Sequence, residues 1–280
     1  MTNAHVTNAH VTNTRVTNLG GKVAVVIGAA GVGNMGQTIA RALADAGAKV
    51  VVAGRNEANL MVLADAIGGD WIACDLTQKA EVYALASETV KRHGKVDIAI
   101  NATGWGLLKK LQDVTEDELD GMVALQFKGV HHFLAAFVAA MPAGGSLIQI
   151  SSASTFALLF DHAAYIGTKA GADALVRCIA NQYGAKGIRA NSIAPGITAS
   201  PMTAQAMATP GIEAAFAREY PLGRIGTADD VADAVVWLCS DGCFLTGQTL
   251  QVNGGLTLRR NPLPHEVGAS IAAAMAAGGT

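Results

Sequence analysis

Short runs of apolar residues recur along the chain at intervals that suit a buried parallel sheet. The first run, VAVVI, follows Lys22 and is apolar at every position, which is typical of a strand covered on both faces. Six further runs bring the number of predicted strands to seven. These six are expected at residues 49–53, 71–74, 96–100, 146–150, 188–193 and 249–252.

Longer stretches with helical spacing of apolar residues separate the runs. Helices are expected at 36–46, 57–67, 79–93, 116–141, 162–183 and 229–240. The regular alternation predicts right-handed crossovers and therefore a single doubly wound α/β (Rossmann) domain, with a seven-stranded parallel sheet and helices on both faces. Ligands of such sheets bind at the carboxyl ends of the strands, so the residues that follow strands are the candidates for function.

Three segments depart from this alternation. Residues 1–19 are polar and repeat every five residues without an apolar run, which predicts a disordered tail and neither a signal peptide nor a membrane span. Residues 20–256 form the expected Rossmann domain, and 257–280 a C-terminal extension whose Ala-rich part suits a helix. Residues 203–220 form a longer excursion that is expected to act as a lid.

Composition narrows the range of partners. A net charge of −2 gives no basic surface for a phosphate backbone, so no nucleic-acid partner is expected. The four cysteines lack a paired spacing and a histidine cluster, which predicts no metal site. A cytoplasmic protein that binds a small molecule fits these observations, and no membrane contact is expected.

A glycine-rich turn links the first strand to the first helix. Three of its glycines match the pattern GxGxxG, which lets the backbone approach a pyrophosphate at the helix N-terminus. The alternative is an ordinary tight turn. The expected cofactor contacts in this turn are Gly28, Gly31, Gly33, Met35 and Gly36.

The end of the second strand bears on the choice of cofactor. Folds that prefer NAD usually carry an acid there for the ribose 2′-hydroxyl, whereas this chain has Arg55. A guanidinium suits a 2′-phosphate, so NADP(H) is favoured. NAD(H) is the alternative, in which Arg55 is a solvated loop residue.

The next two strand ends supply further cofactor candidates. Asp75 and Leu76 follow the third strand, where Asp75 either accepts a hydrogen bond from the adenine amine or caps the next helix. Asn101, Ala102 and Gly104 follow the fourth strand in an NxxG loop that can pack against the cofactor.

Ser152, Tyr165 and Lys169 form the candidate chemical site. Tyr165 and Lys169 are four residues apart in a predicted helix and so share a face, while Ser152 closes the fifth strand. A phenol that works as an acid or base near neutral pH needs its pKa lowered by about three units, or about 4 kcal/mol. An ammonium group at about 4 Å supplies an energy of that order.

With these motifs, residues 20–256 resemble the short-chain dehydrogenase/reductase (SDR) family. The resemblance implies that Tyr165 exchanges a proton with the substrate oxygen, that Lys169 lowers the pKa of the tyrosine and binds the nicotinamide ribose, and that Ser152 orients the carbonyl. Hydride then passes between the nicotinamide and the carbon of a secondary alcohol or ketone. The family also implies a homotetramer.

The resemblance extends to a turn after the sixth strand. Pro195, Gly196 and Thr198 resemble the loop that holds the nicotinamide carboxamide. Gln126 stands where relatives usually carry the asparagine of a catalytic tetrad, and it is therefore the fourth catalytic candidate. This departure, with the longer glycine-rich turn, leaves two alternatives: a reductase of enoyl double bonds, and a nucleotide-binding scaffold without activity.

The substrate pocket has no diagnostic pattern. The apolar residues Phe156, Leu158, Leu159 and Phe160 indicate a hydrophobic or cyclic carbonyl or alcohol substrate. His162 lies one helical turn before Tyr165, and the expectation is that it faces solvent, with a substrate contact as the alternative.

Overall fold

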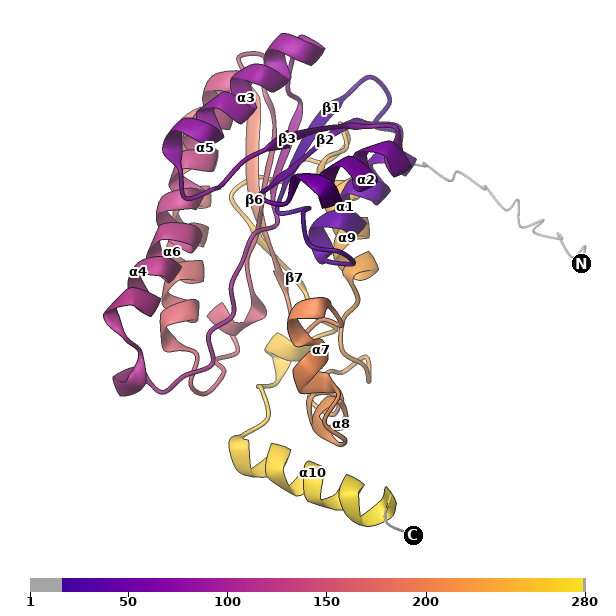
Figure 1. The fold of residues 1–280 in the computed structure, drawn as a ribbon, viewed down its shortest axis with the longest axis vertical. Coiled ribbons are helices and arrows are strands. Elements are labelled where there is room, and N and C mark those ends of the chain that lie inside the picture. Colours follow the sequence, from indigo (N-terminus) through magenta and orange to yellow (C-terminus); the bar gives the residue numbers. More distant parts are fainter. Residues whose placement is uncertain (1–16, 279–280) are drawn as a thin grey trace, which may run out of the picture.

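Seven parallel strands form one sheet in the computed structural model, which describes residues 17–278 (Figure 1). The strand order is β3-β2-β1-β4-β5-β6-β7, so the chain reverses its direction of winding between β1 and β4. This order confirms the predicted doubly wound sheet. The strands are β1 (Val23–Ile27), β2 (Lys49–Gly54), β3 (Asp70–Ala73), β4 (Ile98–Asn101), β5 (Gly145–Ile150), β6 (Ile188–Pro195) and β7 (Thr249–Val252).

Helices cover both faces of the sheet because both faces of its strands are apolar. Side chains of β1 alternate between two cores: Val26 belongs to the core that includes residues of α1, α2 and α9, and Val25 to the core that includes residues of α3, α5 and α6. The α-helices of the described chain are α1 (Met35–Asp45), α2 (Glu57–Ile67), α3 (Lys79–His93), α4 (Glu116–Val123), α5 (Gly129–Ala140), α6 (Ala163–Tyr183), α7 (Pro201–Met207), α8 (Ile212–Ala217), α9 (Ala228–Leu238) and α10 (Pro264–Gly278).

The helix predicted at 116–141 forms, but with a change of winding. A π-helical turn, Ala124–Lys128, joins α4 to α5 and contains Gln126. Glu116–Ala140 is long and apolar enough to cross a membrane, with a mean hydropathy of 1.3 over its most apolar window. In the domain α5 packs against α3 and α6, which accounts for its apolar side chains.

The packed domain starts before the predicted boundary. Leu19, assigned to the disordered tail by the sequence, is fully buried in the core, and its amide donates to Ala46 O at 2.8 Å. A single apolar residue at the end of a polar segment gives no periodic signal, so the pattern missed it. Residues 1–16 of that tail lie outside the described residues.

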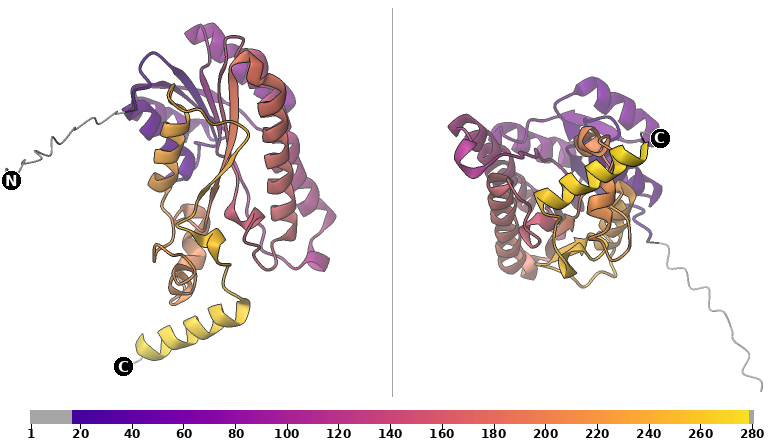
Figure 2. Two further views of the ribbon diagram at one scale, coloured as in Figure 1. Left: turned by 180° about the vertical axis from the view of Figure 1, so that it is seen from behind. Right: turned by 90° about the horizontal axis from the view of Figure 1, so that it is seen from below.

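The excursion and the C-terminal extension lie together beyond the carboxyl edge of the sheet (Figures 1 and 2). The segment predicted as a lid forms α7 and α8. The Ala-rich extension forms α10, as predicted, and α10 packs against α8. These helices therefore lie next to the end of the sheet at which ligands bind.

Candidate active site

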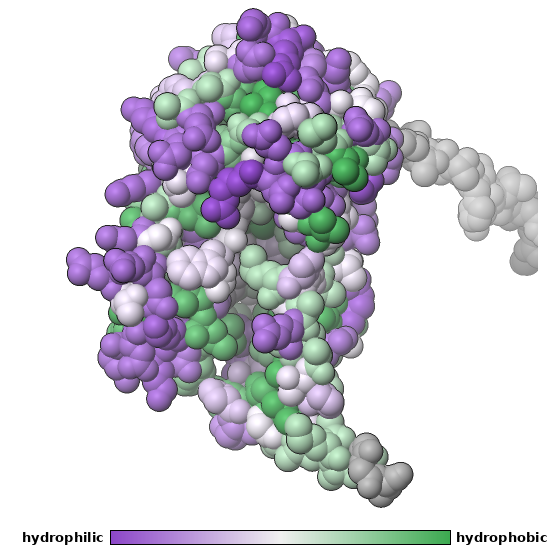
Figure 3. All heavy atoms as spheres, in the orientation of Figure 1, coloured by the Kyte–Doolittle hydropathy of each residue, from purple (hydrophilic) through white to green (hydrophobic). Residues whose placement is uncertain are grey.

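A cavity of about 820 Å³ opens at the carboxyl edge of the sheet. Figure 3 shows the surface hollowed between the body of the domain and the helices below it. Most of the predicted site residues line this cavity although they come from six different strand ends and from α6. They are Gly28, Gly31, Met35, Arg55, Asp75, Leu76, Ala102, Gly104, Ser152, Tyr165, Lys169, Pro195, Gly196 and Thr198.

The glycine-rich turn is fastened so that the first turn of α1 borders the cavity. Asn34 caps the helix: its Oδ1 accepts from Gln37 N at 2.9 Å and its Nδ2 donates to Gly28 O at 2.8 Å. Gly28 has φ +98°, which favours glycine. The amides of Met35 and Gly36 donate to no other described residue, so they are available to an anionic group at the helix N-terminus.

Three of the predicted cofactor residues, Gly33, Gly36 and Asn101, are not among the residues that line the cavity. A Cβ at Gly36 would lie 2.5 Å from Gly28 O, so this glycine allows α1 to pack closely against β1. Gly33, at φ +68°, shapes the turn. Asn101 is buried and its Nδ2 donates to Gln149 Oε1 at 2.9 Å, so its side chain links two strands.

Gln126 also lies behind the cavity wall. It is 1% exposed, its Nε2 donates to Thr168 Oγ1 at 3.2 Å, and its Oε1 accepts from Trp105 N at 3.5 Å. A Cβ built on Gly104 would lie 3.7 Å from Gln126 Oε1 and 3.6 Å from Lys169 Nζ, so both groups border this glycine. The geometry makes Gln126 a support for the loop after β4.

The two polar candidates that follow β2 and β3 differ in their bonding. Arg55 is exposed at the cavity and pairs with none of the described residues, which leaves its guanidinium free for an anion. Asp75 Oδ1 accepts from the amide of Thr77 at 2.9 Å and from its hydroxyl at 2.8 Å. The N-cap of α3 is Gln78, so the helix-capping alternative for Asp75 is wrong.

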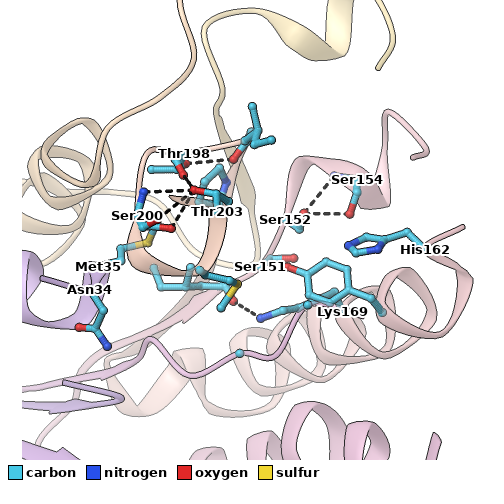
Figure 4. A pocket seen from close by; sticks show the side chains of 18 of the residues that line it. Asn34, Met35, Ser151, Ser152, Ser154, His162, Lys169, Thr198, Ser200 and Thr203 are labelled. Atoms are coloured by element: carbon cyan, nitrogen blue, oxygen red, sulfur yellow. Dashed lines mark hydrogen bonds between the residues drawn. The ribbon is translucent and has the colours of Figure 1, made fainter. Parts of the chain in front are cut away.

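Ser152, Tyr165 and Lys169 meet at the other end of the cavity. Figure 4 shows Ser152 and Lys169 on one side of the pocket, across from Asn34 and Met35. Ser152 Oγ lies 2.8 Å from Ser154 Oγ. Lys169 Nζ donates to Ile150 O at 2.8 Å and lies 5.8 Å from the centroid of the Tyr165 ring.

Burial sets the proton affinities of this group. Burial lowers the pKa of Lys169 to about 8, and the carboxylate of Asp173, one turn further along α6, opposes this shift. Burial raises the pKa of Tyr165, whereas the neighbouring Ser152 hydroxyl lowers it. Asp173 is itself 4% exposed and its Oδ2 accepts from Ser151 Oγ at 2.8 Å. The pKa of Tyr165 is thus raised in this structure and not lowered as the sequence predicts, since the ammonium of Lys169, 5.8 Å from the ring centroid, does not offset the burial.

The structure adds one residue that the sequence interpretation set aside. His162 was expected to face solvent, but it lines the cavity and its ring centroid lies 4.5 Å from that of Tyr165. Its Nδ1 is buried with no hydrogen-bond partner among the described residues, and burial lowers the pKa of its imidazole. Its position three residues before Tyr165, on the same helical face, was the feature of the sequence that could have predicted this contact.

The predicted apolar wall is half right. Leu159 and Phe160 line the cavity. Phe156 and Leu158 are 58% and 68% exposed and do not line it, because the segment turns them away from the pocket.

A doubly wound sheet with a glycine-rich turn and a Tyr–Lys pair at its carboxyl edge defines an NAD(P)-dependent oxidoreductase. A model of the family described as Enoyl-(Acyl carrier protein) reductase matches residues 28–257. This match, with the relatives below, shows that the chain belongs to the short-chain dehydrogenase/reductase family of NAD(P)-dependent oxidoreductases.

Named relatives share this fold over nearly their whole length. D-threitol dehydrogenase of Mycolicibacterium smegmatis is 30% identical, with 86% of this chain and 95% of that protein covered. 7alpha-hydroxysteroid dehydrogenase of Escherichia coli K12 is 34% identical, with 85% and 94% covered. The solved structure of a gluconate 5-dehydrogenase from Burkholderia cenocepacia, in complex with NADP and tartrate, has a TM-score of 0.83 and 28% identity, with 86% and 97% covered.

Proposed function

We propose that the chain interconverts a hydrophobic or cyclic ketone and its secondary alcohol, with NADP(H) as the preferred cofactor. The observation that carries the proposal is the meeting of Ser152, Tyr165 and Lys169 at one wall of the cavity. The relatives named as dehydrogenases of an alcohol group support this reaction class.

The residues at the adenosine end fit a dinucleotide with a 2′-phosphate. The free amides at the start of α1 suit a pyrophosphate. Arg55, which pairs with none of the described residues, follows β2, where folds that prefer NAD usually carry an acid, and its guanidinium suits a phosphate. Pro195, Gly196 and Thr198, at the end of β6 and just after it, line another part of the cavity and would face the nicotinamide. When bound, the reduced nicotinamide supplies the hydride.

The residues of the chain then orient the substrate and transfer the proton. Ser152 donates a hydrogen bond to the substrate oxygen and fixes the carbonyl within reach of Tyr165. Tyr165 donates its phenolic proton to that oxygen as negative charge develops there. Lys169, whose ammonium group is buried, stabilises the resulting phenolate by its positive charge.

Arg55→Ala tests the cofactor preference. Loss of charge-assisted hydrogen bonds to a 2′-phosphate should raise the KM for NADPH by about 10- to 100-fold and leave that for NADH within about twofold. Initial rates at varied cofactor concentration measure both constants, and Arg41→Ala, an exposed arginine on α1, is the matched control. An equal effect on both cofactors would exclude contact of Arg55 with the 2′-phosphate.

The pH dependence of ketone reduction follows from the pKa of Lys169. This pKa is lowered to about 8, so the ammonium form prevails below pH 8 and is lost as the pH rises through that value. Because the ammonium stabilises the phenolate, kcat should fall above about pH 8. A pH–rate profile with saturating NADPH and ketone measures the inflection.

Asp173→Asn should move that inflection to lower pH. The Asp173 carboxylate raises the pKa of Lys169, so its removal leaves burial less opposed. Asp233→Asn, an exposed site on α9, is the control and should leave the profile unchanged. An inflection that stays in place in Asp173→Asn would show that the descending limb does not report Lys169.

A second candidate is the reduction of an enoyl double bond, favoured by Gln126 and by the match to the family described as Enoyl-(Acyl carrier protein) reductase. A panel of ketones and enoyl thioesters, offered with NADPH and then NADH, separates the two reactions by the consumption of reduced nicotinamide. Turnover of ketones supports the proposal, whereas turnover of enoyl thioesters alone would replace it.

A further inference from the structure

The cavity continues past the reacting residues to the C-terminal extension. Asn261, Pro262, Pro264 and Val267 line it, although the family match ends at residue 257. A segment outside the shared family region thus forms one wall of the pocket. Figure 2 shows α10 lying across the end of the domain, below α7 and α8.

Hydrogen bonds fasten this wall to the domain. Asn261 is 8% exposed and its Nδ2 donates to Ala157 O at 2.6 Å, in the loop between Ser152 and Tyr165. Ser270, 5% exposed, donates from its hydroxyl to Gly211 O at 2.8 Å, just before α8. The extension is therefore fixed both to the chemical site and to the excursion opposite it.

An ion pair sets the turn that leads into α10. The guanidinium of Arg260 donates twice to the Glu266 carboxylate, at 2.7 Å each, and Glu266 Oε2 also accepts from Leu263 N at 2.7 Å. These contacts hold the pKa of Glu266 at about 2. The charged groups are thereby paired with each other at the entrance to α10, and neither side chain lines the cavity.

The two walls that face each other here are apolar. Ala206, Met207, Ile212 and Phe216 line the cavity from α7 and α8. Among the described residues that line it from Pro195 onwards, none has a charged side chain. The one amide of the extension, that of Asn261, is already bonded to the main chain. An ionic group at this end would lose its hydration without a counter-charge.

We propose that α7, α8 and the extension form a distal subsite for an uncharged hydrocarbon portion of the substrate, a ring or alkyl chain remote from the reacting carbon. The inference rests on the proposed function in one respect: the substrate that places its hydrocarbon portion in this subsite carries its ketone at Tyr165. Burial of each methylene between the two apolar walls favours longer substrates, and a substrate with a carboxylate or phosphate at its distal end is rejected.

The test compares a series of 2-alkanones, from 2-butanone to 2-decanone, with the full chain and NADPH. In the wild type, kcat/KM should rise by about threefold to fourfold for each methylene until the subsite is filled. Val267→Asp places a carboxylate on the wall and should lower kcat/KM for 2-decanone by at least about tenfold, with 2-butanone changed by less than about twofold. Ala273→Asp, exposed on the same helix, is the matched control.

A second variant, Val267→Trp, and a measurement of binding separate a failure of the subsite from a failure of the proposed reaction. Val267→Trp fills the subsite without adding charge and should impair long ketones in the same way. The rise in Tm on adding each ketone to the NADPH complex measures binding without turnover. Chain-length dependence of Tm in the wild type and in Ala273→Asp, but not in Val267→Asp, supports the subsite even if no ketone is reduced, in which case only the proposed function fails. Equal chain-length dependence in all variants, or none in the wild type, overturns the subsite.

Discussion

Tyr165→Phe is expected to lower kcat for ketone reduction by at least about 1000-fold while NADPH affinity changes by less than about twofold. The variant keeps the aromatic ring beside His162 and removes only the hydroxyl that would donate the proton. General acid catalysis by a positioned side chain accounts for a rate factor of this size. Single-turnover rates with excess enzyme measure the chemical step, and quenching or enhancement of NADPH fluorescence measures binding.

Tyr183→Phe, at the far end of α6, is the matched control because it also removes one phenolic hydroxyl. It should retain activity within about twofold. Turnover of Tyr165→Phe at a tenth of the wild-type rate or faster would contradict the assignment of Tyr165 as the acid.

Gly36→Ala is expected to lower the free energy of unfolding by about 1–3 kcal/mol and to weaken NADPH binding. The new Cβ would lie 2.5 Å from Gly28 O and 2.8 Å from Gly28 C, both backbone atoms that cannot rotate away. Relief of this overlap requires α1 to move from β1, which displaces the helix N-terminus from the cavity. Urea unfolding with and without NADPH measures both effects.

Gly167→Ala is the control for the same change in a helix interior. A Cβ there meets nothing within 4 Å, so the higher helix propensity of alanine should raise stability by up to about 1 kcal/mol. Equal stability of Gly36→Ala and the wild type would show that α1 does not depend on the close contact with β1.

The strands were predictable because a parallel sheet covered on both faces demands unbroken apolar runs. Each predicted strand has a counterpart, although β4 starts at Ile98 where the apolar run starts at Val96. Leu19 was missed because its burial depends on contact with the end of α1, which a local pattern does not contain. Helix and strand identity is thus local information, while domain boundaries depend on tertiary packing.

The candidate site divides in the same way. Ser152, Tyr165 and Lys169 could be found because strand ends and helical spacing place them at one edge. Gln126 could not be placed, because its side chain is directed by the π-helical turn and held by Trp105 N. The position of His162 depends on the path of the loop before α6, which sequence periodicity does not determine.

The sequence did not predict that the C-terminal extension forms a wall of the cavity, because this too depends on tertiary contacts. An Ala-rich segment predicts a helix but not where it docks, and its position rests on Asn261 and Ser270 contacts far apart in the chain. Contacts of this kind are made between side chains and main-chain carbonyls, which leave no pattern in the sequence.

The most direct test of the account is the fate of the hydride. Purified chain is incubated with NADPH deuterated at the transferring position of the nicotinamide and with a ketone from the panel, and the product is analysed by mass spectrometry and NMR. One deuterium is expected on the carbinol carbon of the product formed by the wild type, and no labelled alcohol is expected with Tyr165→Phe. Deuterium found instead on a carbon of a reduced enoyl thioester, with no label in any alcohol product, would contradict it.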